Sequence, residues 1–202
     1  MLHNSELIKK GFTLVELLIV FAVIAILSSI LVANFSEIRQ QLALKRAAHK
    51  LAQDIRWAQE MAMAVEKEER CFNPDGTPKS SDYKYGFGVV FSTQDCEGNK
   101  PCKDEYILYA DNNGNRMYQP SDPDYDILLS NPDFGATEVQ SYSGSATRLN
   151  IVFEPPNPTV FFRATSDEEL PVQEVFITLQ IKNNPAKTKT IIVNKAGLIY
   201  VE

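Results

Sequence analysis

Histidine and cysteine, which often build catalytic or metal sites, are scarce in this chain of 202 residues, which has two histidines and three cysteines. The histidines are His3 and His49, and Cys71, Cys96 and Cys102 lack the paired spacing of zinc ligands. A structural zinc site is therefore poorly supported. The sequence also has neither a phosphate-binding glycine loop nor a G-x-S-x-G nucleophile motif. These absences argue against an enzyme.

Excess positive charge is also missing. The formal net charge is −6, from 20 lysines and arginines against 26 aspartates and glutamates. A protein that grips nucleic acid over its whole surface neutralises phosphates with basic side chains, so nucleic acid is not an expected partner. A local basic strip does lie near the C-terminus, and lysines are also common guards of a solvated sheet edge. Its members are Lys182, Lys187, Lys189 and Lys195.

Proline and glycine do not occur from Phe12 through Arg70, so nothing in this stretch breaks a helix. The pattern predicts one helix over about Thr13–Lys67, with a length of about 80 Å at the standard rise. Beyond Asn34 the helix becomes amphipathic, and its apolar stripe is expected to pack on a globular domain. The stripe comprises Ile38, Leu42, Leu44, Ala47, Ala48, Leu51, Ile55, Ala58, Ala62 and Val65. Burial is also expected for Trp57 and Met61, and the alternative is that these two form a partner-binding edge.

The segment Phe12–Asn34 is apolar and contains one charged residue, Glu16. About 20 apolar residues at the helical rise span about 30 Å, the thickness of a bilayer core. Lys9 and Lys10 precede the segment, so the positive-inside rule keeps the N-terminus cytoplasmic. The sequence therefore predicts a single-pass protein of the cytoplasmic (inner) membrane, with everything after Asn34 outside.

Three kinds of segment could explain this pattern. A secretory signal peptide has a shorter apolar region followed by a small-residue cleavage site. A plain signal anchor leaves Glu16 unexplained, because a carboxylate in a membrane helix costs a few kcal/mol and such residues usually have a partner. The third kind has a polar leader, cut before the apolar helix.

The run Lys9-Lys10-Gly11-Phe12-Thr13-Leu14-Val15-Glu16 resembles the signal of type IV pilins and type II secretion pseudopilins. The resemblance implies that a prepilin peptidase cuts between Gly11 and Phe12 and acts as N-methyltransferase on the new terminus. It also implies that Glu16, the fifth mature residue, pairs in the fibre with the terminal amine of a neighbouring subunit. Two opposite charges inside an apolar bundle neutralise each other, whereas one alone is penalised.

One position departs from the family pattern. Many members have a proline at the twenty-second mature residue, which bends or melts the helix, whereas this chain has Ala33 there. Alanine is the best helix former. The helix is therefore expected to continue through Ala33.

The chain beyond Arg70 contains short β-type runs separated by Gly, Pro, Asn and Asp clusters, which predicts antiparallel β-structure. The last two runs are expected to form a hairpin. The runs are Tyr85–Ser92, Glu105–Ala110, Tyr125–Leu129, Leu149–Glu154, Thr159–Arg163, Val175–Lys182, Thr190–Val193 and Leu198–Val201. The predicted fold class is α+β: a long N-terminal helix packed on a C-terminal antiparallel sheet.

This order of elements is similar to that of the H-type minor pseudopilins and related minor pilins. The expected organisation is a leader at 1–11, a transmembrane or fibre-core helix at 12–34, its amphipathic continuation at 35–68 and a β-rich head at 69–202. The implied function is that of a structural subunit, processed and then assembled with other pilin or pseudopilin subunits through its helix. The fibre would be a type IV pilus or a type II secretion pseudopilus, extracellular or periplasmic. The alternative is a minor pilin that binds DNA or another extracellular ligand.

Two further sites are predicted from spacing. Cys96 and Cys102 are close enough to form a disulfide over a small loop, while pairing of Cys71 with either remains open. Asp111, Asn113, Asn115 and Asp122 follow the ligand spacing of a calcium loop, although Arg116 stands where that loop has glycine. The other explanation is an Asx-rich turn. Calcium is the one cofactor for which the sequence offers a candidate site.

Overall fold

The computed structural model describes residues 12–64, 86–94, 102–112, 114–119, 126–142, 147–155, 159–164 and 169–202. The chain divides into two compact units, Met1–Arg39 and Gln40–Glu202. The first unit contains the apolar part of the N-terminal helix. The second contains the rest of that helix and all the described strands.

The helix α1 extends over Leu14–Met63 and is helical through Ala33, as predicted. Its predicted end at Lys67 lies outside the described residues. Thr13 precedes the first helical residue, and its carbonyl accepts the first intrahelical hydrogen bond from the Leu17 amide at 3.2 Å. Thr13 is therefore the N-cap of α1.

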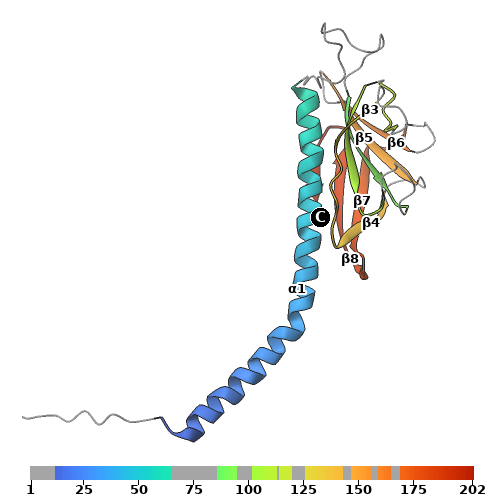
Figure 1. Ribbon diagram of the computed structural model, residues 1–202. Coiled ribbons are helices and arrows are strands. Elements are labelled where there is room, and N and C mark those ends of the chain that lie inside the picture. The colour runs from blue at the N-terminus through green and yellow to red at the C-terminus, as the bar shows by residue number, and fades with distance from the viewer. Residues whose placement is uncertain are drawn as a thin grey trace, which may run out of the picture. The chain divides into compact units, whose positions relative to one another are not determined.

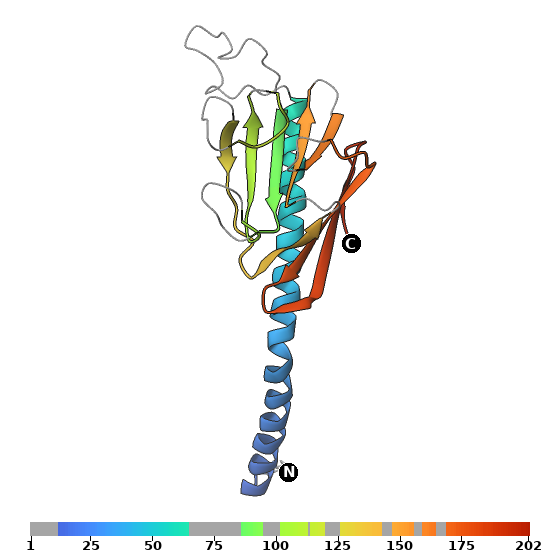
Figure 2. The same ribbon diagram turned by 90° about the vertical axis from the view of Figure 1, so that its right-hand side faces the viewer.

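Nine described strands form two antiparallel sheets in the second unit (Figure 2). The first sheet has the order β3-β2-β1-β5-β6 and the second the order β4-β7-β8-β9. The strands are β1 (Gly86–Ser92), β2 (Tyr106–Asp111), β3 (Asp126–Ser130), β4 (Thr137–Tyr142), β5 (Arg148–Glu154), β6 (Thr159–Ala164), β7 (Glu174–Ile181), β8 (Asn184–Asn194) and β9 (Ile199–Val201). The α+β class predicted from the sequence is confirmed.

Each predicted β-type run overlaps a strand, and β8 and β9 form the predicted hairpin. The sequence analysis missed β4, whose residues Thr-Glu-Val-Gln-Ser-Tyr are mostly polar. It also began β8 at Thr190, six residues late. Both errors concern polar segments, whose place in the sheet depends on pairing with β7 rather than on their own hydrophobicity.

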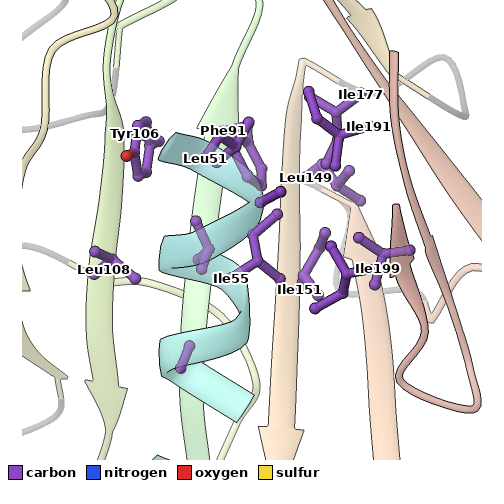
Figure 3. Packing of buried hydrophobic residues seen from close by; sticks show 14 of the residues in the cluster. Leu51, Ile55, Phe91, Tyr106, Leu108, Leu149, Ile151, Ile177, Ile191 and Ile199 are labelled. Carbon is purple, nitrogen blue, oxygen red and sulfur yellow. The ribbon is translucent and has the colours of Figure 1, made fainter. Parts of the chain in front are cut away.

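The second half of α1 runs alongside the strands of the second unit (Figure 1). Leu51 and Ile55 are fully buried, and they pack among apolar side chains of both sheets (Figure 3). The helix residues in this core are Leu44, Ala48, Leu51, Ala52, Ile55, Ala58, Met61 and Ala62. The sheet residues around Leu51 and Ile55 include Phe91, Tyr106, Leu108, Leu149, Ile151, Ile177, Ile191 and Ile199. One core thus joins the helix to both sheets.

Three apolar residues of the helix are not buried as predicted. Ile38 is 59% exposed, Leu42 44% and Trp57 44%. The core stripe follows Leu44, Leu51, Ala58 and their neighbours, and Trp57 lies one position off it. Met61, for which burial was also expected, is buried.

Among the described residues, several polar contacts fix the helix to the sheets. Arg56 Nη2 donates to the Ile199 carbonyl at 2.7 Å, and Gln59 Nε2 donates to the Gly197 carbonyl at 3.2 Å. The Tyr106 hydroxyl donates to Asp54. Because these bonds are directional, they set the position of the helix along the β8–β9 hairpin, which hydrophobic contact alone would leave less defined.

The turn between β8 and β9 predicts a large effect for Gly197→Ala. Gly197 has φ of 81°, where a side chain is strained, and a Cβ there would lie 2.3 Å from Gln59 Nε2. The left-handed strain costs about 1 kcal/mol, and losing the Gln59 hydrogen bond costs about 1 kcal/mol more. We expect the free energy of unfolding of the full chain in detergent to fall by about 2 kcal/mol.

Gly135→Ala is the matched control. Gly135 has a similar φ of 69°, but nothing lies within 4 Å of a Cβ built there. This variant should show the strain alone, a loss of about 1 kcal/mol. Equal losses for the two variants would show that the Gln59 contact contributes nothing.

Candidate assembly site

The N-terminal part of α1 offers an apolar surface that the other described residues leave exposed. Phe12 is 83% exposed, and large apolar side chains from Leu14 to Ile30 are about half exposed or more. Among the described residues, α1 is the one helix long and apolar enough to cross a membrane. Glu16 is the single charged residue in this stretch, and it lies in the first turn of the helix.

Thr13 and Glu16 are joined by three hydrogen bonds. The Thr13 amide donates to Glu16 Oε2 at 3.0 Å, and the Thr13 hydroxyl donates to the same oxygen at 3.0 Å. The Glu16 amide donates in return to Thr13 Oγ1 at 3.2 Å. This reciprocal pattern is a capping box. The sequence analysis missed it, although Thr13-Leu14-Val15-Glu16 has the T-x-x-E spacing that predicts one.

The sequence model of the prokaryotic N-terminal methylation motif matches residues 8–32. Neither the comparison with curated proteins nor that with solved structures finds a match. The motif is the prepilin-type signal of type IV pilins and pseudopilins. It covers the predicted cleavage position, the N-cap and Glu16, and none of the head.

The signal and the fold together are those of a membrane-anchored, pilin-like protein, in which a long N-terminal helix packs on antiparallel sheets. The motif implies processing by a prepilin peptidase. Phe12 is the first described residue, and Gly11, on the other side of the predicted cut, lies outside the described residues.

The described part of the candidate calcium loop forms a turn around the Asp111 side chain. The Gly114 amide donates to Asp111 Oδ1 at 2.8 Å, and the Arg116 amide donates to Oδ2 at 2.7 Å. Asn115 Oδ1 accepts from the Met117 amide at 2.8 Å. These contacts are those of an Asx-rich turn, in which amide groups occupy the oxygens that a cation would need. Asn113 and Asp122 lie outside the described residues, so calcium binding stays untested.

Arg116 fastens this turn to the first sheet. It has φ of 65°, which is uncommon for a residue with a side chain. Its guanidinium donates to both carboxylate oxygens of Glu154, at 2.6 and 3.2 Å, and lies 3.5 Å from the centre of the Phe161 ring. A bidentate pair combined with a cation–π contact holds the strained turn in place.

A second carboxyl group is buried beside the turn. Asp126 on β3 is directly opposite Asp111 on β2, and both are almost fully buried. Burial raises the pKa of Asp111 to about 6 and that of Asp126 to about 8. The Gln119 amide donates to Asp126 Oδ2, whereas Oδ1 has no partner among the described residues. An acid with one unsatisfied buried oxygen favours its neutral form.

The lysine strip does not form a continuous free positive surface. Lys182 pairs with Asp104 at 3.0 Å, and Lys195 pairs with Glu169 at 3.0 Å. Lys187 and Lys189 lie on β8, whose outer edge β9 covers only in part. This placement agrees with the sheet-edge explanation of the strip.

Of the three cysteines, the structure describes Cys102, which is buried. Cys71 and Cys96 lie outside the described residues. The pairing of Cys96 with Cys102 therefore stays a prediction.

The buried carboxyl pair predicts that the head loses stability as the pH rises. Both groups bind a proton more tightly in the folded state, so between about pH 4 and pH 8 the unfolded chain binds fewer protons than the folded one. The free energy of unfolding should therefore fall by more than about 1 kcal/mol from pH 5 to pH 8. A single group that is protonated in the folded state and ionised in the unfolded state changes this free energy by about 1.4 kcal/mol for each pH unit. Thermal unfolding across this range measures the effect.

Asp126→Asn should flatten this pH profile, because the amide keeps the shape and removes the titration. Asp104→Asn, which changes a partly exposed carboxylate paired with Lys182, is the control and should keep the slope. Stability that rises from pH 5 to pH 8 would contradict the assignment of the buried pair.

The cysteine spacing predicts a Cys96–Cys102 peptide in mass-spectrometric mapping under non-reducing conditions. Cys71→Ser should leave this bridge intact, and Cys96→Ser should remove it and lower the free energy of unfolding by about 2–3 kcal/mol. A peptide that links Cys71 to Cys102 would show that the bridge joins the region after the helix to the sheet instead.

Proposed function

We propose that this chain is a minor pilin or pseudopilin subunit of the H-type. In this proposal it inserts into the cytoplasmic membrane with its head outside and is cut between Gly11 and Phe12. It then assembles through α1 with other pilin or pseudopilin subunits into a type IV pilus or a type II secretion pseudopilus. The proposal keeps the expected division into a leader at 1–11, an apolar helix at 12–34, an amphipathic helix at 35–68 and a head at 69–202.

The observation that carries the proposal is Glu16 in the first turn of an apolar, uncovered helix. A helix surface of this kind needs either lipid or other apolar helices around it. A carboxylate on it needs a cation when it leaves the headgroup region. A methylated N-terminal amine on Phe12 of a neighbouring subunit supplies such a cation.

The head has a supporting role in this proposal. The core residues of α1 between Leu44 and Ala62 attach the two sheets directly to the assembling helix. A subunit built this way carries both sheets on the second half of its assembling helix. The paired lysines Lys182 and Lys195 give no specific support to the alternative of a DNA-binding tip.

Processing is tested by mass spectrometry of the chain purified from membranes. The expected mature protein begins at Phe12 and carries one N-methyl group. An intact Gly11–Phe12 bond, or a mature N-terminus at another residue, would overturn the cleavage step.

Assembly is tested with Glu16→Ala. The variant should be processed and remain in the membrane, but its incorporation into sheared fibres should fall at least about tenfold. The reason is that a charged N-terminal amine left unpaired in apolar surroundings costs more than about 1.4 kcal/mol. Glu60→Ala, which removes an exposed carboxylate from the head-bound part of α1, is the control and should incorporate normally. Normal incorporation of Glu16→Ala would remove Glu16 from the mechanism.

A further inference from the structure

The side of α1 that faces away from the core has a pattern that packing does not require. Residues at steps of four, four, three and four, from Leu42 to Trp57, lie on one ridge of the helix, opposite the buried stripe around Leu51 and Ile55. Leu42 and Trp57, at the two ends of this outer ridge, are each 44% exposed. The outer ridge is thus apolar at both ends and cationic between them. It comprises Leu42, Arg46, Lys50, Gln53 and Trp57, all of them exposed.

The cations of the outer ridge are not used within the part of the chain that the structure describes. Among those residues, no hydrogen bond or ion pair engages the side chains of Arg46 and Lys50. The sequence from Gln40 to Arg56 contains one acid, Asp54, which accepts the Tyr106 hydroxyl. Arg46 and Lys50 stand at i and i+4, where like charges destabilise a helix. An anion from outside the chain would relieve this repulsion, so the ridge favours an acidic ligand.

We propose that the outer ridge of α1 docks an acidic segment of a different polypeptide. The carboxylates of this segment pair with Arg46 and Lys50, and its apolar side chains contact Leu42 and Trp57. Arginine and tryptophan dominate the binding energy of many interfaces, which makes the ridge a compact anchor. Charge complementarity fixes the register of such a segment and favours it over neutral ones. The inference goes beyond the proposed function, because the ridge belongs to the second unit and its partner need not be part of a fibre.

A second copy of this chain is a poor partner for the outer ridge. Within the described part of the head, ion pairs already engage four carboxylates, and two further carboxyl groups are buried. The paired acids are Asp104, Glu138, Glu154 and Glu169, and the buried ones are Asp111 and Asp126. Using a paired acid would break one ion pair for each one formed, whereas an acidic segment of another protein has no such cost.

Nucleic acid and lipid also fit the outer ridge less well. A nucleic acid binds through many phosphate contacts, whereas the ridge offers two cations on a chain of net charge −6. Basic clusters that bind lipid lie immediately beside a membrane helix, whereas Arg46 follows Asn34, the end of the apolar segment, by twelve residues. The observations therefore favour a protein partner.

The experiment uses the full chain in the membranes of cells that produce it, with a photo-crosslinking amino acid in place of Gln53. This residue is the uncharged polar member of the ridge and lies between Lys50 and Trp57. The expected product joins it to a peptide of a different polypeptide that contains two or more Asp or Glu residues, identified by mass spectrometry. Replacing those acids by lysine should abolish crosslinking to the unchanged chain and restore it to the chain with Arg46→Glu and Lys50→Glu.

Variants of the ridge give the size of the effect. Arg46→Glu combined with Lys50→Glu should lower the crosslinking yield at least about tenfold, and Trp57→Ala should lower it several-fold. The purified variants should unfold in detergent at the same temperature as the unchanged chain, which excludes an effect through the fold. If the charge reversal lowers that temperature, Arg46→Gln combined with Lys50→Gln takes its place and should also lower the yield.

Matched controls change the same chemistry outside the ridge. Lys182→Glu combined with Lys189→Glu alters the net charge equally and should keep the yield. Tyr200→Ala, at a residue that is 37% exposed on β9, is the control for Trp57→Ala and should keep it too.

A crosslink to a second copy of the chain, to nucleic acid or to lipid would overturn the proposal, as would the absence of any crosslinked product. A yield that the charge changes leave unaltered would overturn it as well. These outcomes do not bear on cleavage after Gly11 or on the role of Glu16, so the proposed function stands or falls separately.

Discussion

Packing of one helix face against two sheets is the interaction on which the head depends. Both sheets contribute apolar side chains to the core that they share with α1. Residues from Leu44 to Ala62 on α1 supply the missing layer, with fully buried Leu51 and Ile55 at its centre. Burial of large aliphatic side chains is worth about 1.5–3 kcal/mol each. Without α1 the sheets would expose this surface to water.

The same helix meets two different environments along its length. In the first unit its apolar side chains are uncovered on all sides, as suits lipid or other helices. In the second unit a narrow stripe is buried and the opposite face is polar. The absence of proline and glycine allows one helix to serve both, and Ala33 lies in its continuous backbone. The two environments therefore differ through the side chains that the helix presents, and the helical backbone continues from one to the other.

Much of the fold could be predicted because its signals are local. Helix α1 follows from periodicity and missing breakers, and the apolar strands follow from β-branched and aromatic runs. The strand β4 could not be found in this way, because Thr137 and its polar neighbours become a strand only by pairing with β7. The predicted burial of Trp57 was wrong, because the spacing of apolar residues does not define how far around the helix the buried face extends. At the candidate assembly site, Glu16 could be identified as a lone charge in an apolar segment. Its hydrogen bonds with Thr13 could have been predicted only from the T-x-x-E spacing of the two residues.

The attachment of α1 to the sheets also determines how the protein carries load. The helix is part of the core rather than the end of a linker, and its core residues lie in sequence along the strands. A force along the second half of α1, within the second unit, would act on this row of contacts together instead of opening them one at a time. The Arg56 and Gln59 bonds link the same part of the helix to the β8–β9 hairpin. The two sheets are thus held to this part of the helix by contacts that share a load.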